Sequence, residues 1–482
     1  MIRRVLLGLT ITALWVAGAV LGITGAALRT SAGREIVADW GLRAANRWLQ
    51  GSVTVGQIGG SFLRGLEVRD LEVRSEDGSP VLTAERVTIR YGIRDLLRGH
   101  IVFGSLRLDR PEMILVQEEP GAPLNLVRLI PRGEGERGPG PLVAFGGVEI
   151  EDGLVVVKTP VPADGGAVLE RTSGPLGDLQ VRRFEGLEGG LAYLRVASPE
   201  PNAPILAEFD GLQVLVSDPA VRVTDVRGTA ELWSDSVRLG FARFQLPGTH
   251  GEIEGVVSWP EGPLMLDLRG SVAPGSTDDV RGLVRALPAG LVGDARFTIT
   301  SRGAEVVAFT SSALALRGRA GGEMRGRLGM VVGPDDRWAF TDTDLQFVQF
   351  DLEYFRGFLD TLPIGGRLTG RIAANGPGER LSLNVDGTFF DHLVTDRPIS
   401  SVLGRGQVSL VDEDVIFDRF RVDQADIALA SVQRLVPSVL LMGRLWAEGW
   451  LDGSWRNATF EGELRYADPP LAETLGRGWV RL

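Results

Sequence analysis

Histidines and glycine-rich motifs are the residues of this chain that could carry chemistry. His100, His250 and His392 stand alone, without a second His or a carboxylate at metal-ligand spacing such as H-E-x-x-H. Acidic residues are spread along strand-like segments as solvated charges usually are. We therefore predict surface or turn histidines, no catalytic residues, no metal, no cofactor and no enzyme activity.

Two motifs look like nucleotide-binding loops but lack the required context. The segment from Gly133 to Gly138 matches G-x-G-x-x-G, yet Pro139 and Gly140 follow where a helix should begin. Lys158 and the threonine after it resemble the end of a phosphate-binding loop, but the preceding residue is valine where glycine is needed. No G-x-S-x-G nucleophile elbow occurs. We interpret the first motif as a linker and the second as part of a strand.

Composition excludes further classes of function. The formal net charge of -11 provides no basic footprint for nucleic acid. The absence of cysteine excludes disulfides and thiolate metal sites. Hydrophobic residues make up 44% of the 482 residues, which is sufficient for a folded core.

The N-terminus carries the pattern of a membrane anchor. Arg3 and Arg4 precede an uncharged run of 24 residues from Val5 to Leu28, about 36 Å of helix, which exceeds the hydrocarbon core of a bilayer. The positive-inside rule predicts a cytoplasmic N-terminus, with a single-pass anchor over residues 1–29 and the remaining chain exported. A cleaved signal peptide is the alternative, although its apolar region normally spans only about 7 to 15 residues.

The exported part changes from helical to strand periodicity. Apolar residues recur every four positions over 34–50, which predicts an amphipathic helix that opens a segment over 30–140 together with the first strands. Period-two alternation follows, as at Val87, Ile89 and Tyr91, and it dominates an elongated, repetitive β-region over 141–482. The predicted fold class is mainly β, an antiparallel sheet preceded by one transmembrane helix.

Turn signals and one internal repeat organise these strands. Asp-Gly pairs predict tight reversals at Asp77, Asp152 and Asp452, whereas the pair at Asp386 is either a turn or a bulge. Pro- and Gly-rich stretches over 131–141, 159–177 and 198–204 predict loops. Leu-Pro pairs ending at Pro288 and Pro363, 75 residues apart, each follow a short helical pattern and precede strands, which suggests two copies of one module.

The one-sided strands pose a physical problem. Each Leu or Phe side chain left in water forfeits roughly 1.5 to 3 kcal/mol, so the apolar face must be covered. Because few helices are predicted, the sheet has to fold over itself, either as a closed sandwich or as an open trough that suits acyl chains. A continuous sheet of about one strand per 12 residues would reach roughly 170 Å.

The order of several segments behind the anchor resembles the N-terminal part of the TamB and AsmA-like family of bacterial envelope proteins. The resemblance covers residues 1 to about 160 best. It rests on 66–74, 84–89, 106–116, the Leu-Asn-Leu triplet at 124–126, and 148–156.

The resemblance implies a β-sheet curled into a β-taco-like apolar groove, anchored in the inner membrane and spanning the periplasm, that moves phospholipid toward the outer membrane. The expected partners are phospholipid acyl chains, the inner membrane and an outer-membrane β-barrel of the TamA type. We predict that the groove is lined by six residues: Leu368, Ile372, Leu381, Leu383, Val385 and Phe389.

Two alternatives belong to other classes. One is a translocation and assembly module subunit that aids insertion or secretion of outer-membrane β-barrel and autotransporter proteins. The other is a structural envelope β-protein with a dry interior. Members of the TamB type are longer and have a C-terminal domain that is not evident here, so we expect a fragment or a short member.

Overall fold

The computed structural model describes Arg43, Asn46 and residues 50–481, except 62–64, 92–100, 120–121, 123, 130–141, 162–169, 199, 201–202, 218–219, 234, 259–264, 282–287, 302–305, 335–336, 356–364, 412–413, 436–441, 456 and 469–470. The predicted anchor over 1–29, with Arg3, Arg4, Val5 and Leu28, lies outside these residues. Within the described ranges, no helix combines the length and the apolar character needed to cross a membrane.

The chain is mainly β, as predicted, and divides into two compact units, Met1–Ser234 and Asp235–Leu482. The division of the exported part near residue 140 remains a prediction.

The first unit pairs its strands in antiparallel fashion except at one crossover. Strand β5 pairs in parallel with β6 and β7, and β9 then pairs antiparallel with both. The parallel step needs a connection across the sheet, which includes the short helix α4 (Asn125–Arg128). The strands of this unit are β1 (Gly51–Thr54), β2 (Gln57–Ser61), β3 (Gly65–Ser75), β4 (Pro80–Tyr91), β5 (Ile101–Val116), β6 (Val143–Phe145), β7 (Val148–Pro160), β8 (Arg171–Gly174), β9 (Gly177–Ala197), β10 (Ile205–Ser217) and β11 (Ala220–Leu232).

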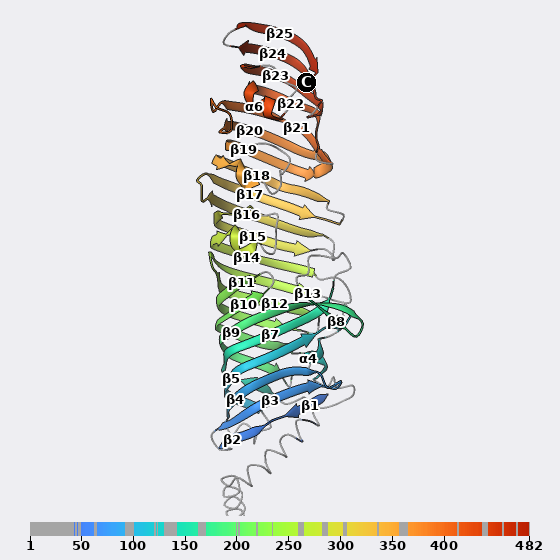
Figure 1. Cartoon of the computed structure of the whole chain (residues 1–482), viewed down its shortest axis with the longest axis vertical. Helices are drawn as coiled ribbons and strands as arrows, with labels where there is room; N and C mark the ends of the chain where they lie inside the picture. The colour runs from blue at the N-terminus through green and yellow to red at the C-terminus, as the bar shows by residue number, and fades with distance from the viewer. Residues whose placement is uncertain are drawn as a thin grey trace, which may run out of the picture. The chain divides into compact units, whose positions relative to one another are not determined.

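The second unit is an antiparallel meander in which each strand pairs with the next along the chain. Figure 1 shows these strands, green to red, following one another in chain order. They are β12 (Ser236–Leu246), β13 (Thr249–Ser258), β14 (Met265–Ser276), β15 (Leu291–Ser301), β16 (Val307–Gly318), β17 (Glu323–Val332), β18 (Trp338–Asp351), β19 (Gly366–Pro377), β20 (Leu381–Asp391), β21 (Ile399–Val411), β22 (Asp414–Ala428), β23 (Arg444–Ser454), β24 (Thr459–Asp468) and β25 (Leu471–Arg481).

Short helices punctuate this meander every four strands. Helix α5 (Thr277–Val280) follows β14, the 3-10 helix η1 (Leu352–Phe355) follows β18, and α6 (Leu429–Leu435) follows β22. Their first residues lie 75 and 77 residues apart. A further 3-10 turn, η2 (Gly378–Arg380), joins β19 to β20. The predicted module is therefore four strands and one short helix, and it recurs a third time at α6.

The outcomes of the turn predictions differ. Asp77 and Gly78 form the turn between β3 and β4, as expected. The predicted turn at Asp152 is wrong: this residue lies inside β7 in a left-handed conformation (φ 51°), at a register shift against β9. Asp386 and Gly387 are neither turn nor bulge, because both pair regularly with β19 and β21. The loop predicted over 159–177 is wrong in part, since β8 lies within it.

Bulges interrupt several strands of the second unit. Asp342 and Gln349 in β18 and Arg419 in β22 adopt left-handed conformations at register shifts. Gly326 in β17 and Gly370 in β19, with φ of 143° and 151°, have a backbone conformation that side chains strongly disfavour. An extra residue bends its strand and increases the local twist, so these positions give the sheet local bends.

Candidate functional site: the apolar face of the second unit

Strand β20 has two chemically different faces. Its described odd-numbered positions from Leu381 to Phe389 carry aliphatic, aromatic or glycine residues, and the even-numbered positions between them carry Ser, Asn, Asp and Thr. Burial follows the same alternation, since each even-numbered residue from Ser382 to Thr388 is exposed and the odd ones are not. We call the first side the apolar face and the second the polar face.

Pairing with the neighbouring strands brings all six predicted groove residues to the apolar face. Leu368 lies opposite Phe389, and Ile372 lies opposite Val385. Leu381 and Leu383 lie on the same side of β20, where Leu381 faces Val408 of β21. The predicted set is thus spatially contiguous across β19 and β20.

Glycines complete this face and were missed in the prediction. Gly370 and Gly387 face each other, and Gly404 and Gly406 lie opposite Val385 and Leu383. A methyl group at Gly404 would lie 2.6 Å from a ring carbon of Phe420, because that ring rests on the glycine backbone. Glycine at every other position of a strand-like run is the signal that could have revealed these residues.

The apolar face is packed unevenly. Leu381 is only 3% exposed, but Leu368, Ile372, Leu383, Val385 and Phe389 are half-buried. Two buried clusters flank this region. One is formed by Leu291, Leu314, Met324, Phe347 and Phe350, with Leu368 and Ile372 packed against it. The other is formed by Val408, Phe420, Val422, Ala425 and Phe460, with Leu383 packed against it.

The polar face carries charges that pair across strands. Arg371 donates two hydrogen bonds of 2.6 and 2.7 Å to the carboxylate of Asp344, which holds the pKa of this carboxyl below its ordinary value of 3.8. Arg421 similarly reaches Glu448 at 3.0 Å. Exposed pairs of this kind add little stability, because solvent screens them, and they mark the solvent side of the sheet.

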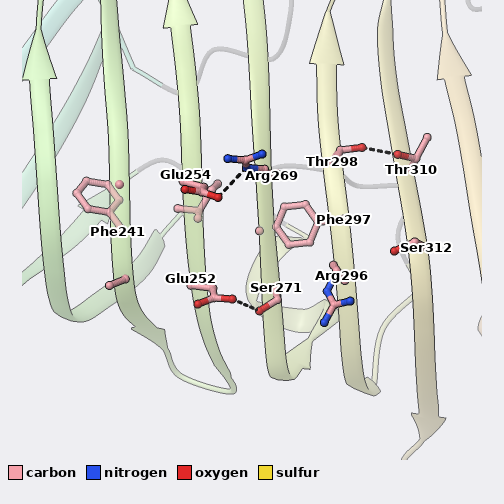
Figure 2. A pocket seen from close by; sticks show the side chains of 14 residues that line it. Phe241, Glu252, Glu254, Arg269, Ser271, Arg296, Phe297, Thr298, Thr310 and Ser312 are labelled. Carbon is pink, nitrogen blue, oxygen red and sulfur yellow. Dashed lines mark hydrogen bonds and ion pairs between the residues drawn. The ribbon is translucent and has the colours of Figure 1, made fainter.

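A depression of about 550 Å³ lies over β12 to β16, and its lining includes residues of both faces, such as the neighbours Phe297 and Thr298. Figure 2 shows that its charged and hydroxyl groups largely bind one another. Arg269 pairs with Glu254 at 2.6 Å, and Ser271 donates to Glu252 at 2.8 Å. The lining contains no histidine, and its carboxylates lie on exposed strand positions.

The two histidines in the described part of the chain lie outside the predicted groove lining. His250 lies at the start of β13 and His392 follows β20, while His100 falls outside the described residues. Among the residues that the structure describes, no three His, Asp or Glu side chains gather where they could hold a metal ion.

Comparison with known proteins gives no relative. No protein family, no curated protein and no solved structure matches the chain. The function is therefore argued from the apolar face itself.

Proposed function

We propose that the second unit curls into a groove lined by the apolar face, and that the groove holds acyl chains of phospholipids. The observation that carries this proposal is the partial exposure of Leu368, Ile372, Leu383, Val385 and Phe389. In a closed sandwich such side chains would be buried against a second layer. Full burial of such a side chain is worth roughly 1.5 to 3 kcal/mol, and an acyl chain bound along the sheet would bury the part that is still exposed.

The local bends support a curled sheet. Bulges, as in β18 and β22, and strand glycines such as Gly326 and Gly370 can curve a sheet. They interrupt the hydrogen bonds between strands only locally. Phe420 covers Gly404 and Phe389 covers Gly366, so large side chains alternate with flat backbone on the concave side. Such a surface accommodates a flexible chain by contact alone.

The mechanism requires no covalent chemistry. The described face positions of β19 and β20 between Leu368 and Phe389 are apolar, so a bound chain meets hydrocarbon and glycine backbone, and its head group stays in water. An acyl chain that moves along such a face exchanges apolar contacts for other apolar contacts. The protein would shield the acyl chain from water and provide a surface along which it moves.

Placement in the envelope completes the proposal. The apolar run after Arg3 and Arg4 would anchor the chain in the bacterial inner membrane, with the sheet in the periplasm. The chain would then act as a bridge for phospholipid moving to the outer membrane, consistent with the segments that resemble the TamB and AsmA-like family.

Site-specific photocrosslinking tests the proposal. A photoreactive phenylalanine analogue would replace Val385 on the apolar face or, as the matched control, its neighbour Asn384 on the polar face. We expect crosslinks to phospholipid from position 385 and at most a trace from position 384, read by mass spectrometry after irradiation in cells. Equal labelling from both positions, or none from position 385 in folded protein, would refute the groove.

A further inference from the structure

Three short helices lie at one edge of the second unit. Strands β14, β18 and β22 run in the same direction, because an even number of antiparallel steps separates them. The helices that follow them, α5, η1 and α6, therefore share an edge with the hairpin turns β12–β13, β16–β17 and β20–β21. Each helix contacts one of these turns: α5 contacts the β12–β13 turn, η1 the β16–β17 turn and α6 the β20–β21 turn.

Helix α5 binds the first of these turns through Asp279. Its carboxylate accepts hydrogen bonds from the Gly248 backbone N–H at 2.9 Å and from the Thr249 hydroxyl at 2.7 Å. Thr249 is only 4% exposed, so the contact is shielded from competing water. Charge-assisted hydrogen bonds of this kind are stronger than neutral ones.

The 3-10 helix η1 binds the second turn through Tyr354, which is 75 residues after Asp279 and likewise the third residue of its helix. Its hydroxyl accepts a hydrogen bond of 2.9 Å from the Ala320 backbone N–H. Its ring fills the space beside Gly318, where an added methyl would lie 2.3 Å from a ring carbon. Helix α5 holds the same turn through Asp278, which pairs with Arg319 at 2.8 Å.

Helix α6 repeats the arrangement at the third turn. Arg434 donates to Asp391 over 3.5 Å at the start of that turn, and the Asp391 residue is only 3% exposed. A carboxylate, a phenol and a guanidinium thus each join a short helix to a hairpin turn in three successive modules, although Arg434 is the sixth residue of its helix and Asp279 and Tyr354 are the third of theirs. Different side chains that make the same connection indicate a mechanical role for the helix in each module.

We propose that α5, η1 and α6 are clasps that fix the hairpin turns, α5 holding two of them and η1 and α6 one each, so that this edge of the sheet opens locally where a clasp is released. Breaking the Tyr354 contact loosens the turn between β16 and β17, which Asp278 still holds through Arg319, and leaves the hydrogen bonds along the strands intact. The role of this local opening rests on the proposed function. The edge would form one rim of the groove, and opening it would let an acyl chain enter from the side.

Hydrogen–deuterium exchange of the full chain, without lipid, tests the clasps. Tyr354→Phe removes the hydrogen bond and keeps the ring over Gly318, so the fold is retained. We expect exchange over 318–322 to rise roughly fivefold, as loss of one hydrogen bond implies, with the turns at 247–250 and 391–398 unchanged. The complementary variant Asp279→Ala should accelerate exchange over 247–250 and leave the turn at 391–398 unchanged.

Two results would overturn the proposal. Unchanged exchange over 318–322 in Tyr354→Phe would mean that η1 does not hold the turn. Loss of protection throughout the second unit would mean that the contact supports the whole sheet and is no local clasp. Since no lipid is present, either result leaves the photocrosslinking test of the groove unaffected.

Discussion

Single polar side chains do much of the local organisation in this chain. Asn125 is buried in the crossover between β5 and β6, where its carbonyl oxygen accepts from the backbone N–H groups of Val116 and Leu126 at 3.0 and 2.9 Å. Its amide donates to the Ile114 carbonyl at 2.9 Å. The sequence pattern identified the Leu-Asn-Leu triplet through a resemblance, but only the structure shows why asparagine is needed, with one acceptor and one donor used together.

Asn125→Ala is therefore expected to lower the free energy of unfolding by about 2 kcal/mol or more, because it leaves buried backbone groups unpaired. Gln117→Ala is the matched control, since the Gln117 side chain makes one hydrogen bond to the Ala122 carbonyl at a half-buried position. Its expected cost is below about 1 kcal/mol. Urea denaturation followed by circular dichroism measures both, and equal effects would argue against a special role for Asn125.

At the level of elements, period-two alternation predicted the strands well. Val87 and Ile89 lie in β4, and the run from Leu381 to Phe389 forms β20 with the expected faces. Bulges were not predictable from the sequence. An Asp-Gly pair such as the one at Asp152 is typical of a turn and also occurs at a bulge within a strand, and only the pairing with the neighbouring strand distinguishes the two. The glycines of the apolar face were not predicted for a related reason. Whether a position requires glycine depends on which side chain the neighbouring strand packs against it.

The strand glycines give a direct test. At Gly326 the backbone has φ of 143°, and an added methyl would lie 2.0 Å from the Asp344 carbonyl oxygen, so Gly326→Ala should lower the free energy of unfolding by about 2 kcal/mol or more. Gly333→Ala, in the same unit, meets only an ordinary contact of 3.6 Å and should change it by less than about 0.5 kcal/mol. Thermal unfolding compares the two; a tolerated Gly326→Ala would contradict the close approach of β17 and β18.

At the scale of the molecule, the sequence predicted an internal repeat but did not define how many strands each repeat contains. The 75-residue spacing of Pro288 and Pro363 indicated two modules, and the structure adds the third helix and defines four strands per module. The side-chain contacts of Asp279 and Tyr354 could not be foreseen, because they join helices to turns whose positions follow from the whole meander. Whether the apolar face is open or closed also lay beyond periodicity, which is the same in both cases.

Mass spectrometry of lipid bound to the purified chain tests the proposed groove. The test variant carries Leu383→Asp and Val385→Asp on the apolar face. Its matched control carries Ser382→Asp and Asn384→Asp, the same added charge on the polar face of the same strand. We predict stoichiometric phospholipid with the unaltered chain and the control, and its loss from the folded test variant. Absence of lipid from the well-folded unaltered chain, or its retention in the test variant, would contradict the groove and favour the assembly or structural alternatives.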